Sequence, residues 1–161
     1  MAKLSNAQNT LLVIKSKIPF FDDFTNNEVI TLTRDVTFVK YNENEIVFEQ
    51  NSGGKDIYFV VQGSVDVLLG KMVKRGGRAK YAEHVKLATL KRRSLFGEMS
   101  AITGERRSAR CVSTIDGTTL LRFKVVSKVE DSNKIILAIL YYKFIDILVQ
   151  KLKILDEKVY G

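Results

Sequence analysis

Residues 95–109 of this chain read LFGEMSAITGERRSA, which places a glycine, a carboxylate, a short helix-compatible run and an arginine within reach of one small ligand. Gly97 lets the backbone come close to a ligand, and a loop that opens a short helix presents unpaired N–H groups to a phosphate. Arg107 can donate paired hydrogen bonds to phosphate oxygens, and Glu98 can accept one from a ribose hydroxyl. Arg106 is expected to face solvent, because it points the other way along an extended segment. Taken singly, these residues would be a turn, a helix-terminal acid and a surface charge, but their spacing between two predicted strands indicates a site for a small phosphate ester.

A period of two in hydrophobicity runs through the sequence on both sides of this stretch. Short predicted strands, bounded by Gly, Asn and Asp at nearly regular spacing, cover residues 36–41, 46–50, 57–61, 64–69, 85–90, 110–113 and 118–123. The dipeptide Gln62-Gly63 between two of them is a hairpin signal. This pattern favours an antiparallel barrel or jelly roll.

Helical patterns precede the strands. Residues 4–16 carry apolar side chains at helical spacing, which are Leu4, Ala7, Leu11 and Ile14. Pro19 disfavours a continuing helix at the residue before it. Thr25, with Glu28 three residues later, predicts a capping box at the start of a further helix.

The C-terminal helix is the most regular predicted element. One apolar stripe steps by four and three residues like a coiled-coil seam, and its members are Tyr141, Ile145, Leu148, Leu152, Leu155 and Val159. A second stripe beside it contains Ile136, Leu140, Phe144, Ile147 and Ile154. Two stripes predict two packing partners, the barrel and the same helix of a second subunit. The alternative is a single broad stripe that is covered by the chain's own core.

We therefore expect one mainly β domain, residues 1–161, with flanking helices. A helical segment at 1–35 precedes an antiparallel β jelly-roll barrel at 36–126, which contains the cassette at 95–110 and its short helix. A long helix at 130–160 follows.

Composition narrows the function further. The apolar run from 135 to 155 is broken by charged residues, so it predicts a two-faced helix and not a membrane span, and no apolar leader is present, which favours the cytoplasm. The single cysteine excludes an internal disulfide and a cysteine-based metal cluster, and the single histidine removes most histidine chemistry. The net charge of +8 is concentrated at 71–80 around Gly76-Gly77 and at 91–93. We interpret the first segment as a solvated basic hairpin turn, with at most a weak attraction to an acidic partner or an anionic lipid surface, and expect no specific nucleic-acid site.

The cassette resembles the phosphate-binding cassette of cyclic nucleotide-binding domains, which reads F-G-E, then a small and apolar run, then R-[ST/A]-A. Residues 18–154 resemble the whole domain of the catabolite activator protein and the kinase regulatory subunits, because Ile18-Pro19-Phe20-Phe21, Gly63 and the cassette occur in the family's order. Asn44 and Asn51 stand where many members have glycine, although Asn also tolerates left-handed geometry. Two further departures are Arg93-Ser94 before the cassette and the longer connection at 71–80.

The resemblance implies the ligand-binding residues. Gly97 and Glu98 would serve the ribose and phosphate, Arg107 the phosphate, and the amides of the short helix the phosphate again. The full predicted set is Phe96, Gly97, Glu98, Met99, Ser100, Arg107, Ser108 and Ala109, and no metal is expected. The terminal helix would cover the base, with Gln150, Lys151 or Lys153 as polar contacts, and the alternative is that these are solvated polar positions.

We therefore expect a cyclic nucleotide sensor that signals through its terminal helix to an unknown effector protein. Ser108 favours cAMP, as in the catabolite activator protein, whereas cGMP receptors of the family often have Thr there. The alternatives are a cGMP receptor and a degenerate or differently liganded domain that acts as an interaction or dimerisation module. No catalytic constellation accompanies Glu98, so an enzyme is not expected. The chain stops at Gly161, without a further stretch for a helix-turn-helix.

Overall fold

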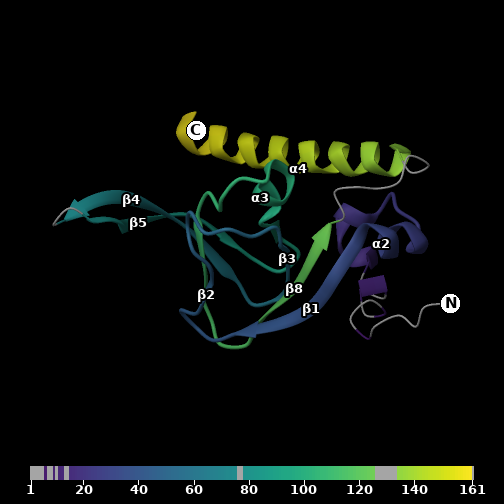
Figure 1. Cartoon of the computed structure of the whole chain (residues 1–161), viewed down its shortest axis with the longest axis horizontal. Helices are drawn as coiled ribbons and strands as arrows, with labels where there is room; N and C mark the ends of the chain where they lie inside the picture. The colour runs from purple at the N-terminus through teal and green to yellow at the C-terminus, as the bar shows by residue number, and fades with distance from the viewer. Residues whose placement is uncertain are drawn as a thin grey trace.

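The computed structural model describes residues 6, 9, 11, 12, 15–75, 78–125 and 134–160. Figure 1 shows its elements, which follow one another as the 3-10 helices η1 (Lys15–Lys17) and η2 (Pro19–Phe21), α2 (Asn26–Leu32), β1 (Thr33–Tyr41), β2 (Ile46–Phe48), β3 (Ile57–Gln62), β4 (Val65–Arg75), β5 (Arg78–Leu90), β6 (Leu95–Phe96), α3 (Glu98–Thr103), β7 (Arg110–Ser113), β8 (Thr118–Val125) and α4 (Lys134–Tyr160).

The strands form two four-stranded antiparallel sheets. The strand order is β1-β8-β3-β6 in the first sheet and β2-β7-β4-β5 in the second. One buried cluster draws on both, with Tyr58, Val60 and Leu120 from the first sheet and Val65 and Cys111 from the second. The sheets therefore pack face to face as a sandwich. The mainly β jelly-roll class is confirmed, but the closed barrel is not, since no ladder joins the two sheets among the described strands.

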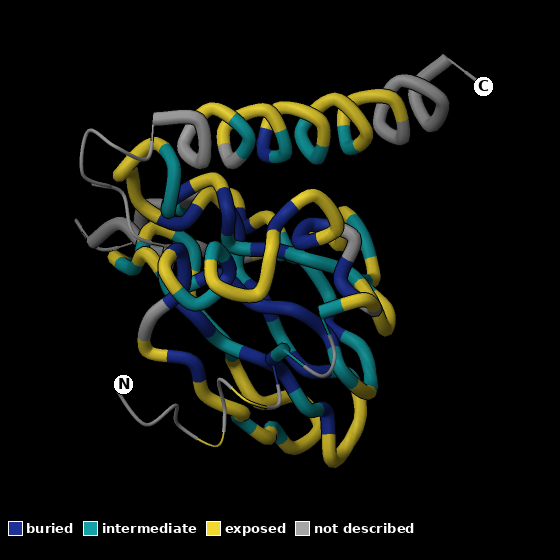
Figure 2. The backbone as a smooth tube through the Cα atoms, turned by 90° about the vertical axis from the view of Figure 1, so that its right-hand side faces the viewer, coloured by how far each residue is buried: buried dark blue, intermediate teal, exposed yellow. Residues whose placement is uncertain are grey.

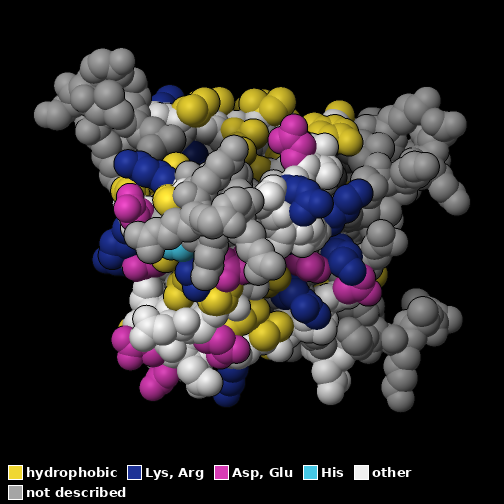
Figure 3. Space-filling model, turned by 60° about the vertical axis from the view of Figure 1, so that its left-hand side comes forward, with side chains coloured by type: hydrophobic (Ala, Val, Ile, Leu, Met, Phe, Trp, Pro, Cys, Tyr) yellow, Lys and Arg dark blue, Asp and Glu magenta, His cyan; other side chains and the backbone are white. Residues whose placement is uncertain are grey.

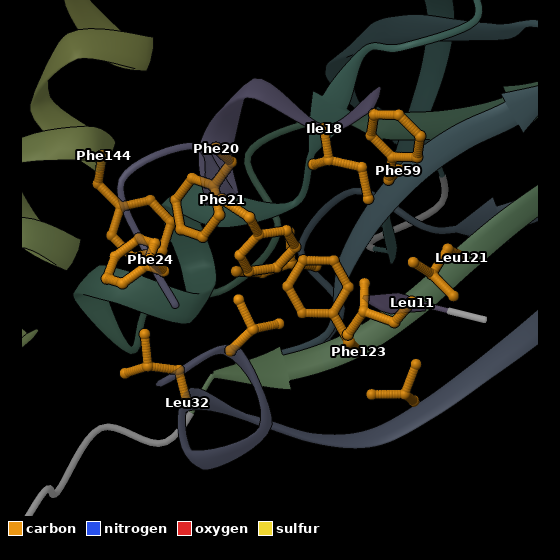
Figure 4. Close-up of a cluster of buried hydrophobic side chains, with 13 residues drawn as sticks. Leu11, Ile18, Phe20, Phe21, Phe24, Leu32, Phe59, Leu121, Phe123 and Phe144 are labelled. Atoms are coloured by element: carbon orange, nitrogen blue, oxygen red, sulfur yellow. The ribbon is translucent and has the colours of Figure 1, made fainter. Parts of the chain in front are cut away.

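The outer face of the first sheet is covered by the N-terminal segments and α4. A second buried cluster lies between these elements and the sheet, and Ile57 and Phe59 of β3 belong to it. The alternate residues Tyr58 and Val60 face the cluster between the two sheets. Burial on both faces explains why β3 reads as a continuous apolar run. Figure 4 shows the aromatic side chains of this core, in which the Phe144 ring of α4 lies 5.1 Å from that of Phe20.

The connection between β3 and β4 corrects the hairpin expected at Gln62-Gly63. β3 pairs with β8 and β6, and β4 pairs with β5 and β7, so the chain changes sheets at this point. Gly63 has a φ of +84°, and a Cβ on it would lie 2.9 Å from the Cα of the buried Thr118. A glycine between two apolar runs is compatible with a hairpin and equally with a corner at which the chain passes from one sheet to the other. Only the pairing of each run with distant strands distinguishes the two.

Other local predictions can be compared directly with the structure. The capping box is confirmed, since the N–H of Thr25 donates to Glu28 Oε2 at 2.7 Å and the N–H of Glu28 donates to Thr25 Oγ1 at 3.3 Å. Left-handed geometry at Asn44 and Asn51 is confirmed by φ values of +63° and +65°. Arg93 also has a positive φ, +75°.

The helical segment at the N-terminus lies partly outside the described residues, and its C-terminal boundaries differ from the prediction. Asn6, Asn9 and residues 11–12 are helical, the other positions from 4 to 14 lie outside the described residues, and Lys15 already belongs to η1. The first strand begins at Thr33, three residues before the predicted boundary, because the C-cap of α2 leads directly into extended backbone.

The basic segment at 71–80 belongs to a hairpin, as expected, but its described residues are paired strand and not loop. β4 continues to Arg75 and β5 begins at Arg78, while Gly76 and Gly77 lie outside the described residues. Within the described part of the chain, β7 pairs with β4 only as far as Leu68. The rest of β4 and β5 forms a two-stranded ribbon that projects from the body in Figure 1.

The two predicted stripes of α4 separate into an inner and an outer face. Phe144 is buried and Ile147 packs against the same core, as predicted for the second stripe. Ile145 and Leu152 of the seam are 58% and 64% exposed. Figure 2 shows α4 lying over the body with exposed residues along its outer side. The side chains of Ile136, Leu140, Ile154, Leu155 and Val159 lie outside the described set.

Within the described part of the chain, no helix is long and apolar enough to cross a membrane.

The sheet-changing corner can be tested with two glycines of similar backbone geometry. Gly63→Ala should lower the free energy of unfolding by more than Gly117→Ala, by at least about 1 kcal/mol, because it adds a clash with Thr118 to the left-handed strain. Gly117 has a φ of +73°, but a Cβ added to it would meet nothing within 4 Å, so its variant measures the strain alone. Urea denaturation of both variants gives the comparison, and equal losses would contradict this account of the corner.

Candidate ligand-binding site

The cassette is a tight passage from strand to helix and back. After β6, Gly97 takes a left-handed conformation with φ +83° and serves as the N-cap of α3. As in any helix, the first-turn N–H groups of α3 lack intrahelical partners. The glycine at the N-cap offers no side chain to accept hydrogen bonds from them. A second left-handed glycine, Gly104, ends the helix by donating its N–H to the Ser100 carbonyl at 3.1 Å. The loop that follows places Arg107 next to Gly97, at the start of α3.

Arg107 is held by backbone carbonyls from two other segments. Its Nη1 donates to the Gly97 carbonyl at 3.0 Å and its Nη2 to the Asp56 carbonyl at 2.9 Å. The guanidinium also lies over the Phe48 ring, 4.3 Å from its centroid. The residue is only 4% exposed, and its buried Nε has no hydrogen-bond partner in the described structure. The guanidinium is thus fixed in place with donor capacity left over.

Two glycines leave the room that this arginine occupies. A Cβ on Gly97 would lie 2.8 Å from Arg107 Nη1 and 2.8 Å from the Asp56 carbonyl oxygen. A Cβ on Gly54 would lie 3.0 Å from Arg107 Nη2. The cradle for the guanidinium therefore needs glycine on both sides.

Burial controls the titration of the groups around Arg107. Desolvation lowers the pKa of Arg107, and the neighbouring Tyr58 and Asp56 oppose this. Desolvation also raises the pKa of Tyr58 to about 12 and that of the buried Cys111 thiol to about 12. The phenol and the thiol therefore stay neutral at physiological pH beside a guanidinium that remains charged.

Glu98, the first residue of α3, is 1% exposed. Its Oε1 accepts a hydrogen bond from the Nζ of Lys151 in α4, and the two side chains form an ion pair. The buried carboxylate is thus balanced by a cation from an element 53 residues away in sequence. Figure 1 shows how this is possible, because α4 passes directly over α3.

A family model described as the cyclic nucleotide-binding domain matches residues 38–127, more than half of the chain. The chain belongs to the cyclic nucleotide-binding domain family. The match includes the cassette and all strands of the sandwich except the first part of β1.

Solved structures of family proteins share this fold. The catabolite activator protein of Thermus thermophilus is 24% identical, with a TM-score of 0.57, over 88% of this chain and 61% of that chain. The regulatory subunit of a cAMP-independent protein kinase A from Trypanosoma brucei is 17% identical, with a TM-score of 0.62, over 91% and 46%. The regulatory domain of Toxoplasma gondii PKA with cAMP is 16% identical, with a TM-score of 0.60, over 91% and 50%. This chain thus spans less than two thirds of each.

The structure brings most of the predicted site residues of this family together. Gly97, Glu98 and Arg107 meet at the start of α3, and Phe96 is buried behind them, stacked on Tyr58 at 5.2 Å. Ser100 and Ala109 are buried, whereas Met99 and Ser108 are exposed and lie in contact with each other. Arg106 is exposed as expected, and its Nη1 donates to the Asn51 carbonyl at 2.8 Å.

Sequence reasoning missed several parts of the site. The Asp56 carbonyl and the Phe48 ring hold Arg107, Gly54 leaves room for it, and none of the three lies in the cassette. The dipeptide Gly53-Gly54 before a strand was an available signal. Of the three proposed polar contacts on the last helix, Gln150 and Lys153 are exposed, and Lys151 contacts Glu98. Among the described residues, no group of three His, Cys, Asp or Glu side chains could hold a metal ion.

The two glycines of α3 provide a matched test of the cradle. Gly97→Ala should destabilise the protein by about 1–3 kcal/mol more than Gly104→Ala, because the added methyl overlaps Arg107 and the Asp56 carbonyl. Gly104 has a similar φ of +74° and open space around a Cβ. Thermal and urea unfolding of both variants measures the difference. If Gly104→Ala proved the more costly, the close approach of Arg107 to Gly97 would not be a constraint on the fold.

Proposed function

We propose that this chain is a cyclic nucleotide sensor that prefers cAMP. The observation that carries the proposal is the buried Arg107 guanidinium, which is fixed by two carbonyls and a ring and whose Nε has no partner among the described residues. A buried donor without a partner is costly. An anionic phosphate supplies the missing acceptors and balances the charge.

The residues around Arg107 fit the other parts of such a ligand. The amides in the first turn of α3, which have no partner within the helix, suit the phosphate oxygens, and the Glu98 carboxylate suits a ribose hydroxyl. Gly97 leaves the room that the Arg107 guanidinium needs beside the start of α3. The proposed binding residues are Phe96, Gly97, Glu98, Met99, Ser100, Arg107, Ser108 and Ala109.

The preference for cAMP rests on Ser108 in place of the Thr that is common in cGMP receptors of the family. One similar structure, the Toxoplasma PKA regulatory domain, is described with cAMP. Another, from Trypanosoma, is described as cAMP-independent, so the fold does not determine the ligand. A cGMP receptor is therefore the first alternative to be measured.

The proposal includes a homodimer formed through α4. Tyr141, Ile145, Val149 and Leu152 leave large exposed apolar surfaces on its outer side. Hydrophobic side chains gather along the upper edge of Figure 3, where α4 lies. An exposed apolar stripe of this kind along one side of a helix is typical of a coiled-coil seam. A second copy of the chain covers it most simply, because each helix then presents the same stripe to the other.

One observation favours the second candidate, a differently liganded domain that acts as an interaction module. Glu98 already has a partner in Lys151, so the acid does not need a ligand to be satisfied. In both candidates the role is regulatory and not catalytic, the partner is an effector protein and not a specific nucleic acid, and the location is the cytoplasm.

Exchange of the central arginine separates the two candidates. Titration calorimetry of the wild type with cAMP and with cGMP should show micromolar or tighter binding, tighter for cAMP. Arg107→Lys should weaken this binding by about 100-fold, because lysine keeps the charge but loses the two-pronged hydrogen bonding worth several kcal/mol. Arg106→Lys, at the exposed neighbouring position, should bind like the wild type.

Because Arg107 also supports the fold, unfolding curves of the Lys variant must show that it is folded at the temperature of the titration. Wild-type protein that binds neither nucleotide at micromolar concentration would sink the sensor proposal and leave the interaction module.

The proposed dimer is tested by placing the same charge at two adjacent exposed positions. Ile145→Lys puts an ammonium in the apolar stripe and should convert the dimer to a monomer. Asp146→Lys, one residue along the helix and off the stripe, should leave the dimer intact. Sedimentation equilibrium over a range of concentrations measures both, and a monomeric wild type would contradict the proposed pairing.

A further inference from the structure

The distal parts of β4 and β5 form a two-stranded ribbon, residues 69–75 and 78–85, which we call the basic ribbon. β7 pairs with β4 only as far as Leu68, and among the described strands only β4 and β5 themselves pair within the ribbon. The part of β4 beyond Leu68 extends for about 20 Å at the rise of a strand. The ribbon therefore stands away from the described body of the molecule, as Figure 1 shows.

The ribbon is strongly cationic. Residues 71–80 read KMVKRGGRAK, with no acidic residue and with five cations, which are Lys71, Lys74, Arg75, Arg78 and Lys80. This segment therefore carries +5 of the net charge of +8 of the whole chain. Clusters of about four to eight lysines and arginines attract a protein to an anionic lipid surface. All five cations occupy paired positions of the ladder, so they follow one another along a strand pair and not along a loop.

The register of the ladder places apolar and cationic residues on one face of the ribbon. Directly paired residues of an antiparallel ladder share a face, and so does every second residue along a strand. Leu69 pairs with Val85, and Lys71 is the next residue of β4 on this face. The face ends at the paired positions Arg75 and Arg78. Leu69 and Val85 are 40% and 51% exposed, and Lys71 is exposed, so this face has an apolar root and a cationic tip.

The combination of the two properties favours a lipid surface over other polyanions. An anionic bilayer attracts cations to its headgroups and accepts apolar side chains at the boundary of its acyl chains. Nucleic acids also present phosphates, but their interfaces with proteins are polar and strongly basic. The exposed Leu69 and Val85 would therefore gain little from a nucleic acid, whereas a bilayer removes them from water.

We propose that the basic ribbon docks on the surface of an anionic lipid bilayer and lies along it, with the face of Leu69, Val85 and Lys71 toward the lipid. The cations bind the headgroups, and the apolar pair at the root is buried at the boundary of the acyl chains. The inference goes beyond the proposed function and does not depend on it, because no residue of the ribbon belongs to the proposed binding set.

Removal of two cations at the end of the ladder tests the docking. The full chain should co-sediment with vesicles of phosphatidylserine and phosphatidylcholine, and much more weakly with vesicles of phosphatidylcholine alone. The double substitution Arg75→Gln and Arg78→Gln should weaken binding to the anionic vesicles by about 10-fold or more, because each cation near such a surface strengthens binding by about 5-fold. Binding that does not distinguish the two kinds of vesicle would overturn the proposal.

A matched control removes the same charge at the other end of β5. Lys91 and Arg92 are exposed and follow Leu90, the last residue of the strand. They lie roughly 40 Å from the end of the ladder at the rise of a strand, which is several Debye lengths at physiological ionic strength. Lys91→Gln together with Arg92→Gln should therefore bind like the wild type. Equal losses in the two double variants, both shown to be folded by urea unfolding, would mean that net charge alone attracts the protein and would refute docking by the ribbon.

The apolar root separates a lipid surface from a nucleic acid. Val85→Thr keeps the shape and the β-branching of an exposed side chain and adds a hydroxyl. It should weaken binding to the anionic vesicles by about 3-fold or more, because less apolar surface leaves water. Vesicle binding that is unchanged in Val85→Thr would contradict the burial of the apolar pair. Tighter binding of the wild type to a duplex oligonucleotide than to the vesicles, lost with Arg75→Gln and Arg78→Gln, would make a nucleic acid the partner and overturn the proposal.

Discussion

The geometry of the site depends on the hydrogen bonds that Arg107 donates to two backbone carbonyls. Its side chain joins Gly97 to Asp56, and its own N–H and carbonyl pair with Ser52 and Asn51 at 2.9 and 2.8 Å. One residue thus connects the cassette to the loop between β2 and β3. Because a buried carbonyl without a donor costs about 1–3 kcal/mol, the position of the guanidinium determines the path of both segments. The left-handed glycine before α3 follows from the same requirement, since any side chain there would occupy the space of the guanidinium.

Such an arrangement is not the most stable solution for a small sandwich. Buried charges are often replaced by apolar side chains without loss of stability, and sometimes with a gain. This chain nevertheless buries Arg107 and Glu98 at the edge of its core. The arginine is held by carbonyl dipoles and a ring, and the acid is paired with a lysine from another element. A buried guanidinium with a perturbed pKa, close to a buried carboxylate, marks a candidate binding site.

Features that depend on local backbone chemistry could be predicted from the sequence. The cassette, the capping box at Thr25 and the left-handed Asn44 and Asn51 need only residues within a few positions of one another. Features that depend on distant pairing could not. The Gln62-Gly63 corner has the same local pattern as a hairpin, and the partner of Glu98 lies 53 residues away on a helix whose rotation is fixed by the burial of Phe144. The sequence placed Lys151 near the ligand, but for a contact with the base. The ladder that extends β4 and β5 through the basic segment was missed for a different reason, because like charges on neighbouring strands argue against pairing.

In the proposed sensor, the two faces of α4 would allow an event at one carboxylate to reach a partner molecule. Its inner face carries Phe144 and Lys151, and its outer face carries the exposed Ile145 and Leu152. A helix transmits displacement as a nearly rigid rod, so a change on one face necessarily moves the other. With Phe144 fixed in the aromatic core, a ligand that displaced Lys151 from Glu98 would allow a tilt about that point. The outer stripe near Leu152 then moves further than the part near Ile145, because it lies further from the pivot. In a dimer formed by two copies of α4, the angle between the two helices would therefore change more than the contacts near Ile145. Ligand binding would then be detected as a change in this angle.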